Sequence, residues 1–451
     1  MVDQNELSFR KKLISLILPM TLQNFVFALI PVSDTIMLLF LSSEAMTAVS
    51  LASQVVLVLS LFTISITAGG SMLAAQYWGK GDTGSIEKIF AYMFLLSLPV
   101  MAVFFGCAMF MPEGVMRIFT NEPALIECGI PYLRYAAFSY VFMAMTQIFE
   151  TLLKNVGYVK QCTIVSVISV FENIVLNAIL IFGLLGAPEM GIAGAALATS
   201  ISNFTSFVLC MCFQLKLTKF RLRFKSLFHI DKDLRKRFSI YALPYTLNQL
   251  LWGFGFTMIT VIMGHLGEDA ASANAIATVV KDLVSSLCFA IASGSVIVIG
   301  NELGAGRLDR AKLYGDKLLK ITIVSGIILG LVTAALSPVI LHFTNLNETA
   351  EHYLLIMLLM CSYYILGRSI NSTLIGGIFS AGGDTRFGFI CDTLTMWAFI
   401  VPVGWICAFT LNLPVMVVYF ILNLDEIVKI PAVIIHYRKY KWVKNIIDEK
   451  V

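Results

Sequence analysis

The second half of this 451-residue chain repeats the first half at a constant offset of 225 residues. Most of the matching residues are prolines and glycines, which fix backbone geometry and are difficult to match by chance. Examples are Pro19 with Pro244, Gly69 with Gly294, Gly79 with Gly304, Gly81 with Gly306 and Gly157 with Gly382. Both halves are strings of long apolar segments, so the repeat predicts a duplicated membrane bundle rather than a solenoid. Membrane proteins built from two related halves are mostly transporters.

Composition excludes several classes of protein. The chain is 58% hydrophobic and only 13% charged, whereas a soluble domain carries roughly 25% charged residues. The net charge of +4 does not indicate a nucleic-acid partner, because the basic residues cluster in short loops beside apolar segments. Nine cysteines and five histidines show no metal-ligand spacing, so we expect neither structural disulfides nor a zinc site.

A transmembrane helix needs about 20 apolar residues. The sequence predicts twelve such spans, at roughly 13–40, 46–74, 89–111, 124–153, 161–183, 191–215, 239–263, 270–299, 318–343, 352–378, 387–411 and 414–437. The predicted fold is therefore an all-α integral membrane protein with two six-helix lobes. Because six is even, the halves share one topology and should be related by a pseudo-twofold axis along the membrane normal.

Lysine and arginine residues concentrate on one set of alternate loops, which predicts that both termini are cytoplasmic. We expect an N-lobe at 1–217, a basic cytoplasmic linker at 218–237 and a C-lobe at 238–451. The positive charge of the linker either serves only to orient the protein in the membrane or binds anionic lipid.

Asp34 is the first charged residue that lies inside a predicted span, three residues after Pro31. Charged side chains inside membranes are costly and usually functional. A carboxylate beside a proline bend can bind Na⁺ or exchange a proton if it faces a polar cavity. The alternative is a structural carboxylate that is paired with another helix.

The fifth and sixth spans carry further polar groups. Asn173 and Asn177 are four residues apart, so their amides share one helix face, next to Glu172. Thr199 adds a hydroxyl from the sixth span. Together with Asp34 these groups could supply oxygen ligands to a hard cation, or could simply join helices through hydrogen bonds.

The second half carries its charges elsewhere. Residues that interrupt its predicted spans are Lys281, Asp282, Arg368, Asn371, Asp392, Asp425 and Glu426. Asp392 could pair with Lys281 or with Arg368, and Lys281 could change protonation because buried lysines do so readily. In the first half, Arg134 and Glu150 are sixteen residues apart on the fourth span, so we expect them near opposite membrane surfaces, where snorkelling suffices. Tyr245 and Trp252 belong to an aromatic set that either packs against lipid or lines a chamber for organic molecules.

The chain resembles the MATE (multidrug and toxic compound extrusion) transporters over nearly its whole length. The matching stretches include LPMTLQNFVFALIPVSDTIML, GGSMLAAQYWGKGD, NIVLNAILIFG, GNELGAGRLDRAK and FSAGGDTRFGFICDTLTMWAFIVPVGW. This resemblance implies an antiporter, not an enzyme, that exports organic compounds by alternating access between two lobes, without a cofactor other than H⁺ or Na⁺. The alternatives are a flippase of related architecture for lipid-linked precursors and, further removed, a channel.

The resemblance also implies roles for particular residues. The resemblance makes Asp34 the carboxylate that couples transport to the ion. It makes Asn173, Asn177 and Thr199 the polar residues of the same site. Many relatives carry Asp at the position of Asn177 and Glu at that of Gln249. With one carboxylate left, the site favours H⁺ over Na⁺. The expected substrate cavity is lined by Tyr245, Gln249, Trp252, Lys281, Arg368 and Asp392. We expect a monomer in the cell membrane.

Overall fold

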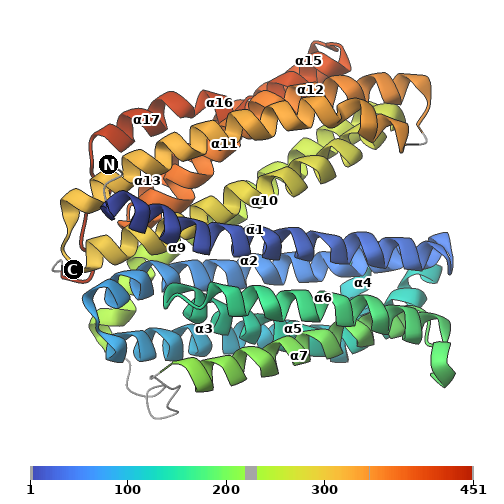
Figure 1. The fold of residues 1–451 in the computed structure, drawn as a ribbon. Helices are drawn as coiled ribbons and strands as arrows, with labels where there is room; N and C mark the ends of the chain where they lie inside the picture. Colours follow the sequence, from blue (N-terminus) through green and yellow to red (C-terminus); the bar gives the residue numbers. More distant parts are fainter. Residues whose placement is uncertain (1–3, 219–230, 345, 449–451) are drawn as a thin grey trace. The chain divides into compact units, whose positions relative to one another are not determined.

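A computed structural model describes residues 4–218, 231–344 and 346–448. Its described residues form helices joined by short turns and contain no strand, as the sequence predicts (Figure 1). Contacts divide the chain into two units. One, called the N-terminal unit, comprises Leu18–Ala74 and Asp82–Lys236. The other, called the C-terminal unit, comprises Met1–Ile17, Ala75–Gly81 and Arg237–Val451.

The N-terminal unit contains most of the first two helices and the five that follow. Its elements are α1 (Gln4–Leu39), α2 (Ser43–Lys80), α3 (Thr83–Phe110), α4 (Pro112–Arg117), α5 (Pro123–Asn155), α6 (Val159–Phe182), the short 3₁₀ turn η1 (Leu184–Gly186) and α7 (Ile192–Leu217). Helix α7 packs along both α5 and α6, and α3 packs along α5. The apolar core between them includes Leu59, Leu133 and Tyr140.

The C-terminal unit contains the remaining elements, the first part of α1 (up to Ile17) and the last part of α2 (from Ala75). They are α9 (Lys232–His265), α10 (Glu268–Gly304), α11 (Leu308–His342), α12 (Glu348–Asn371), η2 (Ser372–Phe379), α13 (Thr385–Thr393), η3 (Leu394–Ile400), α14 (Val401–Trp405), η4 (Ile406–Thr410), α15 (Val415–Leu422), α16 (Asp425–Val428) and α17 (Ile430–Arg438). The segments η2, η3 and η4 are π-helical. Helix α12 packs along α10 and α11.

Eleven described helices are long and apolar enough to cross a membrane, each within one of the first eleven predicted spans or extending it. The twelfth predicted span, at 414–437, is also helical, but its helix is interrupted. The chain there forms three short helices, α15, α16 and α17. Two asparagine side chains bind backbone carbonyls at the break: Asn423 Nδ2 donates to Tyr419 O at 2.8 Å, and Asn371 Nδ2 donates to Glu426 O at 2.6 Å. Irregular backbone persists in a membrane only where the protein supplies such partners.

One pair of repeated glycines, Gly81 and Gly306, lies at tight turns after corresponding helices. Gly81 (φ +81°) follows α2 and Gly306 (φ +72°) follows α10, a left-handed conformation that favours glycine. After the first turn, Asp82 Oδ1 accepts a hydrogen bond from Ser85 N at 3.0 Å and so caps α3. Most of the predicted basic linker, at 219–230, lies outside the described residues.

The close approach of two helix backbones explains the glycine at position 330. A Cβ atom on Gly330 in α11 would lie 2.5 Å from Ser362 O in α12. Gly106, near the end of α3, has nothing within 4 Å of the corresponding position. Small residues let membrane helices approach closely, and Gly330 is one of the glycines, with Gly326, at which α11 approaches α12.

We therefore expect Gly330→Ala to destabilise the protein by about 1–3 kcal/mol, because the added methyl group forces the two helices apart. Gly106→Ala is the matched control, since its methyl group enters open space in a helix interior, where alanine is the better helix former. The measurement is the thermal unfolding midpoint of the purified protein in detergent. Equal midpoints for the two variants would contradict this account of the packing.

Candidate functional site

The structure brings together the four polar residues predicted for a coupling site in the N-terminal unit. Asn177 Nδ2 on α6 donates to Asp34 Oδ1 on α1 at 2.6 Å and to Asn173 Oδ1 at 3.2 Å. Asn173 Nδ2 in turn donates to Thr199 Oγ1 on α7 at 3.3 Å. A single chain of hydrogen bonds therefore joins α1, α6 and α7, and it ends on a carboxylate.

Burial is deepest in the middle of this chain of groups and smaller at its two ends, Asp34 and Thr199. Asn173 is 1% exposed and Asn177 is 0% exposed, while Asp34 is half-buried. The Oδ1 atom of Asn177 is buried and has no hydrogen-bond partner among the described residues. An unpaired buried oxygen is a position where a water molecule or an ion can bind. The arrangement can thus hold a proton on Asp34 or offer several oxygens to a cation.

Glu172 does not belong to this group, although it is the neighbour of Asn173 in sequence. Its Oε1 atom accepts a hydrogen bond from Thr205 Oγ1 at 3.0 Å. Adjacent residues on a helix point in different directions, so Glu172 faces another part of α7. Asp34 remains the carboxylate of the chain that includes Asn177.

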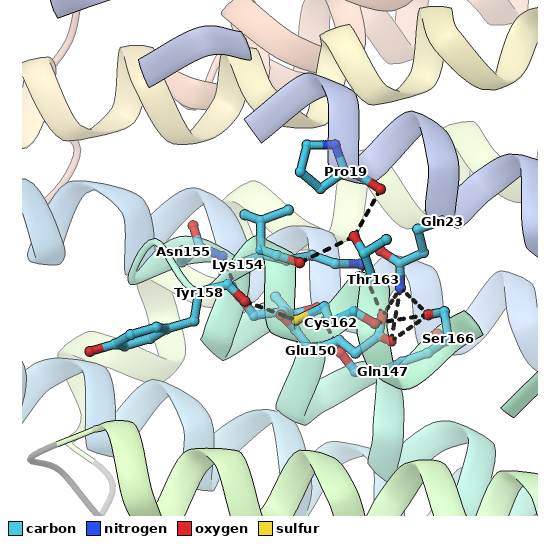
Figure 2. A network of polar contacts seen from close by, with 12 residues as sticks. Pro19, Gln23, Gln147, Glu150, Lys154, Asn155, Tyr158, Cys162, Thr163 and Ser166 are labelled. Carbon is cyan, nitrogen blue, oxygen red and sulfur yellow. Dashed lines mark hydrogen bonds and ion pairs between the residues drawn. The ribbon is translucent and has the colours of Figure 1, made fainter. Parts of the chain in front are cut away.

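A second polar network surrounds Glu150 on α5 (Figure 2). Gln23 Nε2 on α1 donates to both carboxylate oxygens of Glu150, at 2.8 and 2.9 Å, and to Ser166 Oγ at 2.8 Å. Lys154 Nζ forms an ion pair with Glu150 at 2.9 Å. The expectation that Glu150 snorkels to a surface is therefore wrong, since this residue is only 5% exposed and is neutralised within the bundle. Arg134 is exposed, as expected.

In the C-terminal unit, the acids and bases form a different set of pairs from those predicted. Asp392 on α13 pairs with Lys429 at 2.8 Å and accepts from Asn248 Nδ2 at 2.9 Å. Arg368 on α12 pairs with Glu426 at 2.8 Å, and Lys429 also reaches Glu426 at 3.1 Å. The predicted pairing of Asp392 with Lys281 or Arg368 is wrong because the break between α15 and α17 brings Lys429 between the two acids.

Aromatic rings surround two cations of the C-terminal unit, Lys281 and Arg368. Lys281 on α10 donates to Asn423 Oδ1 at 2.9 Å, and its ammonium group lies 4.8 Å from the ring centre of Tyr364 and 5.6 Å from that of Tyr419. The Arg368 guanidinium lies 4.6 Å from the Trp252 ring and 4.9 Å from the Phe289 ring. Such cation–π contacts stabilise desolvated charges by about 2 kcal/mol or more.

The remaining predicted cavity residues lie on α9, beside this network. Tyr245 is close enough to Asp392 for an electrostatic interaction. Gln249 makes no hydrogen bond to these charged groups within the described part of the chain. Sequence reasoning missed Lys429 and Asn423 as members of the network. Their signal was present, because both interrupt an otherwise apolar segment close to Asp425 and Glu426.

The repeat and the helices agree with one family. The MatE family model matches residues 19–179 and, a second time, residues 244–406. The chain belongs to the MatE family of MATE transporters. The two matches begin 225 residues apart, as the sequence repeat requires.

Relatives support this assignment along nearly the whole chain. The chain is 23% identical to "Uncharacterized transporter YisQ" of Bacillus subtilis, covering 96% of this chain and 95% of that one. It is 24% identical to "Probable multidrug resistance protein NorM" of Thermotoga maritima, covering 97% and 94%. A crystal structure of a MATE transporter in complex with MaL6 superposes with a TM-score of 0.87 at 17% identity, covering 96% of each chain. The predicted fold class, twelve membrane helices in two lobes, is confirmed.

The charge network of the C-terminal unit yields a stability prediction. Lys429→Met should destabilise this MATE protein by about 3–5 kcal/mol, because Asp392 and Glu426 then lose a buried cation. Adding Asp392→Asn to the same variant should restore part of the loss, since one buried charge disappears. Lys312→Met is the control, because its partner Asp309 is fully exposed and lies 3.8 Å away. Thermal unfolding in detergent measures all three, and a double variant no more stable than Lys429→Met would contradict the pairing.

Proposed function

We propose that this protein is a proton-coupled antiporter that exports organic compounds by alternating access of two six-helix lobes. The observation that carries the proposal is the chain of hydrogen bonds from Thr199 through the buried Asn173 and Asn177 to Asp34. A carboxylate at the end of such a chain, inside an apolar bundle, is costly unless it has a function.

Names of the relatives support organic substrates. The Thermotoga maritima relative is a probable multidrug resistance protein, and membership of the MATE family supports the same class of substrate for this chain. Aromatic groups of α9 fit that role: Trp252 and Phe256 stack with ring centres 5.6 Å apart. Large flat rings offer adaptable apolar contact area to varied organic molecules.

The donor arrangement around Asp34 favours a proton over Na⁺. Asn177 directs its amide N–H groups, and not its oxygen, towards Asp34 and Asn173. A sodium ion requires several oxygen ligands, so binding would need the Asn177 amide to turn over. Protonation of Asp34 requires no such rearrangement. It only weakens the Asn177 hydrogen bond, because a charged acceptor becomes a neutral one.

The flippase alternative loses support from the same geometry. It requires a cavity in which cationic groups stay available for an anionic headgroup. Of the two cations that could serve such a cavity, Arg368 is paired with Glu426. Lys281 donates to Asn423 and is surrounded by aromatic rings. With both cations already bound within the protein, the antiporter for organic compounds is favoured.

We further propose that the protein lies in the cell membrane as a monomer with both termini in the cytoplasm. Support comes from the basic residues, which flank the ends of the helices on one set of alternate loops. Lys80 ends α2, Lys88 lies in the first turns of α3, and Arg307 follows α10, all on this set.

Asp34→Asn should reduce proton-driven efflux to background, since asparagine keeps the shape and the contact with Asn177 but cannot carry the proton. Efflux of a transported dye from proteoliposomes with an imposed pH gradient measures the effect. Glu172→Gln is the matched control, because Glu172 bonds to Thr205 and lies outside the Asp34 chain. Gradient-driven efflux by Asp34→Asn would remove Asp34 from the mechanism.

The identity of the ion can be tested in the same vesicles by imposing pH and Na⁺ gradients separately. We expect transport to follow the pH gradient and to ignore Na⁺. Asn177→Asp adds a second carboxylate next to Asp34 and should make transport sensitive to Na⁺, because a hard cation prefers charged oxygen ligands. Wild-type efflux driven by Na⁺ at zero pH gradient would overturn proton coupling while leaving the antiporter assignment intact.

A further inference from the structure

We propose that the C-terminal segment 440–448, called the tail here, is a latch that fastens the end of α2 to the C-terminal unit and must release it in each transport cycle. The inference rests on the proposed alternating access. It is carried by contacts within the C-terminal unit, which includes Ala75–Gly81 at the end of α2.

The end of α2 meets the end of α10 through small residues at repeat-related positions. Ala75 and Gly79 on α2 correspond to Gly300 and Gly304 on α10 at the offset of 225. A Cβ atom on Gly79 would overlap the Asn301 carbonyl, and a Cβ atom on Gly304 would overlap the Gln76 carbonyl. The two helices therefore cross with backbones in contact, through the same small-xxx-small spacing on each.

Gln76, in the middle of this crossing, is fully buried and is bound by the tail. Its Nε2 atom donates to Ala381 O at 2.7 Å and to Lys444 O at 3.1 Å. Its Oε1 atom accepts from Ile446 N at 2.9 Å. All polar atoms of one side chain from α2 thus bind backbone groups, and two of the three bonds go to the tail.

The tail itself is firmly seated. Trp442 is 0% exposed, and a Cβ atom on Gly315 would lie 2.9 Å from its ring. Arg237, which lies on α9 and begins the segment Arg237–Val451 of this unit, donates to Ile446 O at 2.6 Å. At the surface Lys80 of α2 pairs with Asp448. The tail therefore joins α2, α9 and α11 at one end of the C-terminal unit.

Helix α2 runs through both units, since Ser43–Ala74 belongs to the N-terminal unit and Ala75–Gly81 to the other. Relative movement of the units must either bend α2 near Ala74 or detach its end. The segment from Ala74 to Lys80 is helical without proline, whereas Gly69, Gly70 and Ser71 lie before it on α2 and could absorb a bend. Our proposal is that the end of α2 detaches, which requires the three Gln76 hydrogen bonds to break together.

The decisive experiment closes the latch covalently. Lys80→Cys combined with Asp448→Cys places two thiols where an exposed ion pair now lies, and a short cleavable bis-methanethiosulfonate joins them in proteoliposomes. We expect cross-linking to lower efflux at least tenfold and reduction to restore it. The two variants that carry only one of the added cysteines, Lys80→Cys alone and Asp448→Cys alone, are treated identically. They control for reaction at the nine native cysteines. Full efflux from completely cross-linked protein would overturn the latch, whereas absence of efflux before cross-linking would instead question the proposed function.

A second variant loosens the latch and is read without transport. Gln76→Ala should speed amide hydrogen exchange in the tail and in the end of α2 by about tenfold, the ratio expected for the net loss of about one buried hydrogen bond. Gln214→Ala is the matched control, since Gln214 is equally buried, on α7 in the N-terminal unit. Unchanged exchange in folded Gln76→Ala protein would show that Gln76 does not hold the tail.

Discussion

Inside a lipid bilayer no water is available to pair with a buried polar group, so every such group must find its partner within the protein. This constraint explains why the polar residues of this chain occur as networks that join helices. Asn177 joins α6 to Asp34 on α1, Gln23 joins α1 to Glu150 on α5, and Lys429 joins the α16–α17 break to Asp392 on α13. The apolar surfaces supply packing, whereas these contacts decide which helices are neighbours.

The sequence alone predicts those networks whose members lie at regular helical spacing. Asn173 and Asn177 share a face because they are four residues apart, and in the structure Asn177 binds both Asp34 and Asn173. The pairing of Lys429 could not be predicted, because it depends on a break after Leu422 that apolar character does not reveal. Glu150 was misjudged for a related reason. Position along a helix indicates depth in the membrane, but it does not indicate whether another helix covers the residue.

The two halves use the same framework for different charges. Gln23 and Asn248 correspond at the offset of 225, and each binds an acid of its own unit, Glu150 or Asp392. Asp34, in contrast, corresponds to the apolar residue Ile259. The ion pairs of Lys429 with Asp392 and Glu426 lie in the second half. The two acids do not correspond, because Glu150 matches Ile375 and Asp392 matches Val167 at the same offset. Each half therefore holds its first helix through an acid on a non-equivalent helix, α5 or α13, and the acid close to a proline, Asp34, is found in one half.

Helix α1 is held to the N-terminal unit on both sides of Pro31. Gln23 binds Glu150 before the proline, and Asp34 binds Asn177 after it. Pro31 has no N–H, so the carbonyl of Phe27 lacks its usual partner and the helix is weakest between the two attachments. The contact at Gln23 involves a carboxylate that Lys154 already neutralises, whereas the contact at Asp34 depends on a charge that one proton removes. Loss of that charge should therefore free the part of α1 beyond Pro31 first, and the part before it should stay fixed.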